Sequence, residues 1–198
     1  GFGGLLAASS PALAVDLDYG QGAEFSIKYS GYARATVGVL LEDHDETAAD
    51  DKWRMNQARA TVNLDFDIKI TKNLTFASVN NYRYNSYAAA GYTDPRSNGG
   101  LSVNGRVTDY RSEYTRRYTN QILRYSNNWA KHNLNALVGY EFNDFSSKTL
   151  DAYGTGIVPG FEVLDVTAKP ERTRGGISQW AVQSVLFNSN YDYDGRYL

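Results

Sequence analysis

The chain has 198 residues, and its 20 Lys and Arg against 22 Asp and Glu give a formal net charge of -2. This balance supplies no broad basic surface for phosphates, so nucleic acid is excluded as a leading partner. The complete lack of cysteine excludes disulfide frameworks, thiol nucleophiles and cysteine-based metal sites. The 16 Tyr and 18 Gly beside only 4 Pro are typical of β-rich chains whose strands have one wet and one apolar face.

The first segment, residues 1–14, reads GFGGLLAASSPALA and ends in Ala12-Leu13-Ala14 before Val15. Small and apolar residues followed by an A-x-A sequence are typical of the end of a signal peptide. A flexible Gly/Ala-rich terminus is the alternative.

Residues 23–41 carry Phe25, Ile27 and Tyr29 on one parity before Gly31, which predicts either one long strand with a glycine kink or a tight hairpin. An acidic segment at 42–51 follows. It lacks the ordered spacing and turn glycine of an EF-hand loop, so we interpret it as a solvated loop.

Residues 52–70 show the cleanest alternation of apolar and polar side chains in the chain. One parity contains Val62, Leu64 and Phe66, and the other contains Asn63, Asp65 and Asp67. This period of two predicts a strand, either in a barrel wall or, with the faces exchanged, in a soluble sandwich. A turn is expected at 71–73, a return strand at 74–87 and a long loop at 88–106, because Asp94-Pro95 and Asn104-Gly105 favour turns.

The stretch 118–142, YTNQILRYSNNWAKHNLNALVGYEF, predicts a β-hairpin because two alternating runs flank a short polar connection. Its apolar parity ends in aromatic residues, Trp129 at one end and Tyr140 with Phe142 at the other. Transmembrane strands keep such rings near the lipid headgroups. The predicted lipid-facing residues are Val62, Leu64, Phe66, Leu134, Val138 and Tyr140.

Residues 143–176 are predicted to be a second long loop with one short strand at 161–166. A further strand is expected at 177–191, and Asp194-Gly195 predicts a two-residue hairpin turn of the primed type. The resulting fold class is all-β: an antiparallel transmembrane β-barrel, represented here by a partial set of strands from a larger barrel. We therefore divide the chain into a signal-peptide remnant or flexible terminus at 1–14 and an outer-membrane barrel segment at 15–198.

Three blocks carry a family resemblance: VNLDFDIKITKNLTF (62–76), the hairpin 118–142 and SVLFNSNYDYDGRYL (184–198). From about residue 52 onward, these blocks resemble the SusC/RagA-type TonB-dependent receptors of the outer membrane, whereas residues 15–51 do not match the family pattern. The resemblance implies import of a bulky nutrient, an oligosaccharide or a peptide, in the cell outer membrane. It also implies a SusD-like surface lipoprotein and TonB as partners, beside membrane lipid.

Few residues suggest chemistry, and we expect no enzyme activity, metal or cofactor. His44 and His132 have no nucleophile or second ligand near them in the sequence. Tyr84, Tyr87 and Tyr92 are candidates to stack on sugar rings in an extracellular loop, or alternatively are girdle residues at a strand end. Arg124, one of a basic cluster with Arg111, Arg116 and Arg117, is predicted to face the lumen and contact substrate.

Three function hypotheses follow from these observations. The first is SusC-like transport. The second is a structural or assembly barrel that carries no solute, and the third is a soluble secreted β-sandwich that binds carbohydrate.

Overall fold

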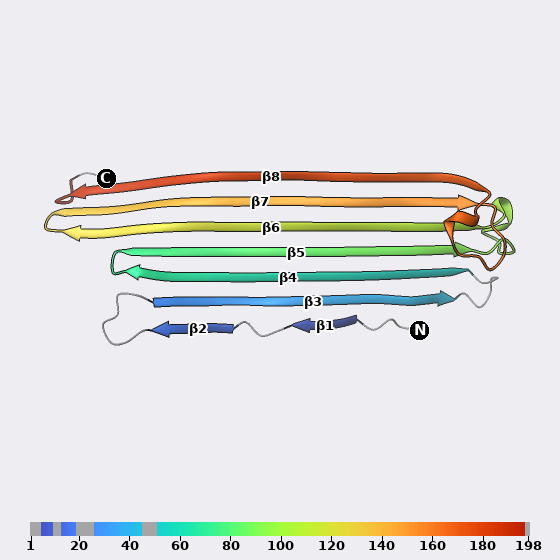
Figure 1. Cartoon of the computed structure of the whole chain (residues 1–198), viewed down its shortest axis with the longest axis horizontal. Coiled ribbons are helices and arrows are strands. Elements are labelled where there is room, and N and C mark those ends of the chain that lie inside the picture. Colours follow the sequence, from blue (N-terminus) through green and yellow to red (C-terminus); the bar gives the residue numbers. More distant parts are fainter. Residues whose placement is uncertain (1–4, 10–12, 19–25, 45–50, 197–198) are drawn as a thin grey trace.

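The computed structural model describes residues 5–9, 13–18, 26–44 and 51–196. These residues form one sheet of eight strands in the order β1-β3-β4-β5-β6-β7-β8, with β2 also paired to β3 (Figure 1). Every pairing between neighbours is antiparallel. The strands are β1 (Leu5–Ser9), β2 (Leu13–Asp18), β3 (Ser26–His44), β4 (Lys52–Thr71), β5 (Leu74–Thr93), β6 (Arg106–Trp129), β7 (His132–Thr155) and β8 (Lys169–Tyr193).

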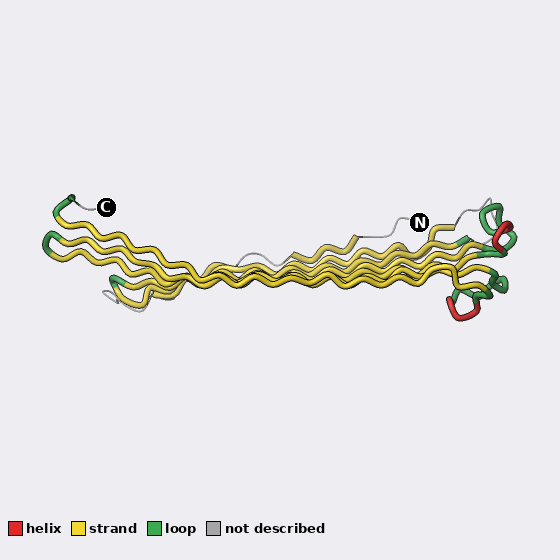
Figure 2. The backbone as a smooth tube through the Cα atoms, turned by 90° about the horizontal axis from the view of Figure 1, so that it is seen from above, coloured by secondary structure: helices red, strands yellow, loops and turns green. Residues whose placement is uncertain are grey.

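The sheet is a single layer, as Figure 2 shows from its edge. β8 forms one margin, while β1 and β2 lie along β3 at the other (Figure 1), so the sheet is open over the described residues. A sandwich would pack a second sheet against one face, whereas all the described strands lie in one sheet. The predicted all-β, antiparallel fold class is confirmed.

The two ends of the sheet differ in the length of their connections. At one end, Lys72-Asn73 joins β4 to β5, Ala130-Lys131 joins β6 to β7, and Asp194-Gly195 follows β8. At the other end, loops 94–105 and 156–168 contain the short 3-10 turns η1 (Leu101–Val103) and η2 (Leu164–Val166). Asp194 and Gly195 have φ of 54° and 73°, so the predicted primed turn is confirmed. Among the residues described, we find no helix with the length and apolar character to cross a membrane.

Several strands are longer than the sequence predicts. β5 continues to Thr93, and β7 and β8 include most of the predicted loop 143–176. β3 runs through Gly31 as one strand, which confirms the long-strand alternative over the tight hairpin. The β5 extension consists largely of Ala and Gly, while the β7 and β8 extensions carry polar residues on both faces. Alternation therefore reveals none of them, but the backbone ladder continues regardless. The strand predicted at 161–166 is wrong, since its second half is η2. Of the predicted acidic loop, residues 45–50 lie outside the described residues.

The leading segment also has structure where it is described. Leu5–Ser9 pairs with 34–38 of β3, and Leu13–Asp18 pairs with 26–31. The assignment of residues 1–14 to a signal-peptide remnant or flexible terminus, with the barrel segment beginning at 15, stays a prediction.

The turn between β6 and β7 yields a first stability prediction. Ala130 has φ of 50°, a left-handed conformation that costs residues with a Cβ about 1–2 kcal/mol. We expect Ala130→Gly to raise the free energy of unfolding by about 1 kcal/mol. Ala136→Gly, inside β7, should lower it by about 0.5–1 kcal/mol. Urea unfolding in detergent micelles measures both, and a loss from Ala130→Gly would contradict the assigned turn.

Candidate functional site

The register of the strands assigns side chains to two faces. Leu64 lies opposite Asn80, Asn80 opposite Thr119, and Thr119 opposite Phe142. Because successive side chains in a strand alternate, all residues in register with Leu64 share one face, here called the Leu64 face. The opposite surface, which carries Asp65, is called the Asp65 face. All six residues predicted to face lipid lie on the Leu64 face by this register, and their contact with lipid stays a prediction.

An apolar band crosses the Leu64 face near the short turns. It contains Ile27, Val62, Leu64, Phe66, Ile68, Phe76, Leu123, Leu134, Val138, Tyr140, Phe142, Val185 and Phe187. Several of these side chains are open, with Leu64 47% exposed, Val138 43% and Phe187 74%. In β7 the band runs for nine residues, from Leu134 to Phe142. A tilted strand needs about 9–11 residues to cross a bilayer. The nine residues of the band in β7 match the lower end of that range.

A polar group interrupts the band between β5 and β6. The Asn80 amide nitrogen donates to the Ser78 hydroxyl at 2.8 Å, and the Thr119 hydroxyl donates to the Asn80 amide oxygen at 2.7 Å. The Gln121 amide nitrogen donates to the Thr119 hydroxyl at 2.6 Å. The four side chains thus satisfy one another, which reduces the cost of placing amides in an apolar surface.

Charge replaces the apolar band on the Leu64 face toward the long loops. The Arg117 Nε lies 3.0 Å from both Asp144 carboxylate oxygens, and Nη2 adds a further hydrogen bond. Arg111 pairs with Asp109 at 3.3 Å in the same direction along the strands. The basic cluster seen in the sequence is therefore divided. Arg111 and Arg117 lie on the Leu64 face with carboxylates, whereas Arg116 and Arg124 lie on the Asp65 face.

Aromatic rings gather at the short-turn end. The rings of Trp129 and His132 stack with centroids 5.4 Å apart, and His132 also lies 4.9 Å from the Tyr193 ring. His132 Nδ1 is 2.6 Å from the Tyr191 hydroxyl. Such rings, apolar with a polar edge, are the ones that collect where lipid meets water. His132 begins β7, directly after the two-residue turn Ala130-Lys131.

The four residues predicted to bind substrate do not form one site. Tyr84 is on the Leu64 face, whereas Tyr87 is on the Asp65 face, where its hydroxyl donates to the Met55 sulfur at 3.0 Å. Arg124 is also on the Asp65 face but lies opposite Thr75, near the short turns. Tyr92 is only 5% exposed, so little of its ring is open to a ligand. A role in substrate binding stays a prediction for these residues.

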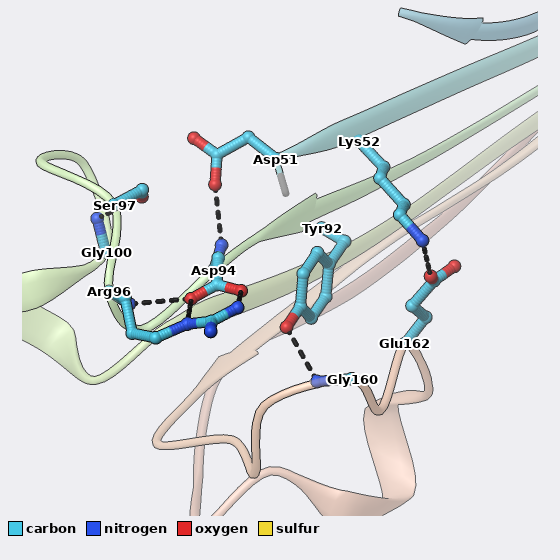
Figure 3. Close-up of polar contacts among 9 residues, drawn as sticks. All are labelled: Asp51, Lys52, Tyr92, Asp94, Arg96, Ser97, Gly100, Gly160 and Glu162. Carbon is cyan, nitrogen blue, oxygen red and sulfur yellow. Dashed lines mark hydrogen bonds and ion pairs between the residues drawn. The ribbon is translucent and has the colours of Figure 1, made fainter. Parts of the chain in front are cut away.

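The long loops are joined in a loop clasp, defined by Asp51, Lys52, Tyr92, Asp94, Arg96, Ser97, Gly100, Gly160 and Glu162 (Figure 3). Asp94, which is 1% exposed, lies at its centre. Its carboxylate accepts from the Arg96 backbone N–H at 2.7 Å and from Arg96 Nε and Nη2 at 2.9 and 2.7 Å. Its own N–H donates to the Asp51 carboxylate at 2.6 Å, and its carbonyl accepts from Ser97 N–H.

The second loop is held to β5 by Tyr92 and to β4 by ion pairs. Tyr92 packs in a small core with Val107 and Ile157, and its hydroxyl accepts from the Gly160 N–H at 2.9 Å. Glu162 receives Lys52 Nζ at 2.9 Å and Arg54 Nη2 at 3.1 Å. These contacts join residues as many as 110 apart in sequence, so no local pattern signals them. Among the described residues, no three His or acidic side chains converge to hold a metal ion.

The clasp predicts a pH dependence. Hydrogen bonds from Arg96 are the main cause that lowers the Asp94 pKa from 3.8 to about 2. Since the folded pKa lies below the unfolded one, the stabilisation is complete above about pH 4 and is lost as the pH falls through 2. We expect about 1–2 kcal/mol after allowing for the exposed Arg96 guanidinium. Hydrogen exchange at Gly100 and Leu101 should accelerate in that window, whereas Asp94→Asn should remove the step.

Comparisons with known proteins address the fold. The sequence matches no protein-family model and no curated protein. The structure is similar to a chain of the RagAB peptide transporter, with a TM-score of 0.67 and 13% sequence identity. It is also similar to chains of the RagAB peptide importer in the 'closed-closed' state (TM-score 0.67) and the 'open-open' state (0.64), each at 12% identity. Each match covers 97% of this chain and 26% of the other, so the chain spans about a quarter of its structural neighbours.

Proposed function

We propose that this chain is a section of the wall of an outer-membrane β-barrel that imports a bulky nutrient, an oligosaccharide or a peptide, in the manner of SusC/RagA-type receptors. The observation that carries the proposal is the apolar band of the Leu64 face. It crosses a sheet one layer thick (Figure 2), and polar side chains such as Asn63 and Asp65 lie behind it on the Asp65 face.

Both faces of the sheet need a suitable environment. The band exposes large side chains such as Leu64 and Val138, which water does not favour. Behind them, Asn63 and Asp65 need water or polar partners. A closed barrel in lipid satisfies both faces, because hydrocarbon covers the outside, water fills the inside and closure pairs every strand edge.

Similarity of fold and sequence supports the same proposal. The structural neighbours are chains of a peptide transporter. The three blocks that resemble the SusC/RagA family lie in the hairpin of β4 and β5, the hairpin of β6 and β7, and the end of β8. These three segments share the short-turn end of the sheet, where barrels of this kind face the periplasm. The loop clasp would then lie outside the cell, the side on which we expect a SusD-like lipoprotein, with TonB acting from the periplasm.

Charge insertion tests the assignment of the faces. Leu64→Arg or Val138→Arg should lower the free energy of unfolding in lipid by about 2–4 kcal/mol, as expected for arginine near the bilayer midplane. Asn63→Arg and Asn135→Arg, on the other face, are the matched controls and should cost much less. Urea unfolding in lipid vesicles measures the four values. Equal losses on the two faces would refute a water-filled interior.

Lipid contact and transport are tested by two separate experiments. Because the chain has no cysteine, single cysteines can be introduced and labelled without background. A bimane label at Leu64→Cys should be quenched by brominated lipid, whereas a label at Asn63→Cys should not.

Cells that lack the protein should then fail to deplete some peptides or oligosaccharides from a defined mixture, measured by mass spectrometry. Quenching without any loss of uptake would favour the non-transporting barrel.

A further inference from the structure

Four arginines from four successive strands gather on the Asp65 face. They are Arg34 in β3, Arg59 in β4, Arg83 in β5 and Arg116 in β6, here called the arginine cluster. The register places Arg34 opposite Thr61, Thr61 opposite Arg83, and Arg83 opposite Arg116, while Arg59 occupies the next row on this face. Three of the four line a cavity of about 420 Å³ together with Tyr32 and Tyr114.

The arginine cluster has no carboxylate partner among the residues that the structure describes. Its neighbours in register are neutral, namely Thr36, Thr61, Asn63, Asn81, Asn85, Tyr114 and Tyr118. The one polar contact that the structure records is from Arg116 Nε to the Asn143 amide oxygen, at 3.3 Å. Toward the short turns, the first acids on this face are Asp65 and Glu141, which share one row about 13 Å along the strands from the row of Arg83 and Arg116, at about 3.3 Å per residue. That separation exceeds the screening length of about 8 Å at physiological ionic strength.

This arrangement is electrostatically unfavourable by itself. Arg83 and Arg116 are directly opposite each other, and like charges in that position destabilise a pair of strands. Nearer the short turns, the same face instead sets Lys28 opposite Asp67. Four positive charges are therefore concentrated in two adjacent rows of this face, with no acid in those rows. An anion placed among the four side chains would remove the repulsion, and the planar guanidinium forks match carboxylate and phosphate oxygens.

We propose that the arginine cluster is a binding site for a solute that carries two or more carboxylate or phosphate groups. Its position on the face opposite the apolar band separates it from lipid headgroups. Tyr32, 42% exposed, adds an aromatic surface at the edge of the cavity for an uncharged part of the same solute. The proposal of a binding site depends only on the arginine cluster. Its place on an import path, which would make the nutrient acidic, rests on the proposed function.

Binding is measured on the whole protein in detergent, with citrate as the probe and maltotriose as a neutral comparison. Titration calorimetry should show saturable citrate binding that weakens as salt increases, and citrate should raise the melting temperature. The double variant Arg83→Gln/Arg116→Gln should lower citrate affinity at least tenfold. Lys69→Gln is the matched control, since it removes one positive charge from β4 on the same face about 33 Å from Arg59, and it should change affinity less than twofold.

Two further measurements separate binding from folding. Without citrate, Arg83→Gln should leave the melting temperature unchanged or raise it, because it removes a like-charge contact. Arg83→Lys keeps the charge but not the fork, so affinity should fall several-fold with stability unchanged. Equal citrate binding by the parent and the double variant would overturn the proposal. So would an absence of binding together with a loss of stability in the double variant, which would show that an acidic protein segment already fills the site. If the protein binds citrate but cells with and without it take up peptides and oligosaccharides equally, the transport function alone would be refuted.

Discussion

The backbone hydrogen-bond ladder is the constraint on which the rest of this structure depends. β6 and β7 pair without a break from Arg106 opposite Thr155 to Trp129 opposite His132. Within the described residues, the buried apolar side chains are few and include Tyr92, Val107 and Ile157, so burial of a core contributes little to holding the sheet together. The ladder fixes which side chains share a row and a face, and the surroundings of each face must supply the stabilisation that a core supplies elsewhere.

One strand consequently serves several environments. In β7, Val138 belongs to the apolar band while Asp144, six residues along on the same face, binds Arg117. Alternate residues of the same strand belong to the polar Asp65 face. The mean hydropathy of the chain, averaged over these environments, is -0.50, although the band itself is strongly apolar. A low mean hydropathy is therefore compatible with a chain that crosses a bilayer by strands.

The sequence predicts those parts of the fold in which the pattern is local. Residues close together in the chain predict the hairpins around Lys72-Asn73 and Ala130-Lys131 and the primed turn at Asp194-Gly195. They also predict which apolar residues share a face with Leu64. The ends of β5, β7 and β8 near the long loops are not predicted, because small residues in β5 and polar residues on both faces of β7 and β8 erase the alternation. The loop clasp and the arginine cluster also escape prediction. Arg83 and Arg116 are 33 residues apart in the chain, so only the register of β5 against β6 brings them together.

Arg116 and Arg117 have different partners on the two faces of the sheet. They are consecutive in β6 and therefore point to opposite faces. Arg117 is opposite Asp144 and holds its carboxylate with three hydrogen bonds, whereas Arg116 is opposite Phe145 and adjoins Arg83. If this level of the strand required only hydrated charge, Arg116 and Arg117 would have similar partners. At this level of the sheet, the arginine on the face of the apolar band is paired with a carboxylate. Arg116, on the Asp65 face, has no carboxylate partner among the described residues, and this is the face on which we propose that an anion binds.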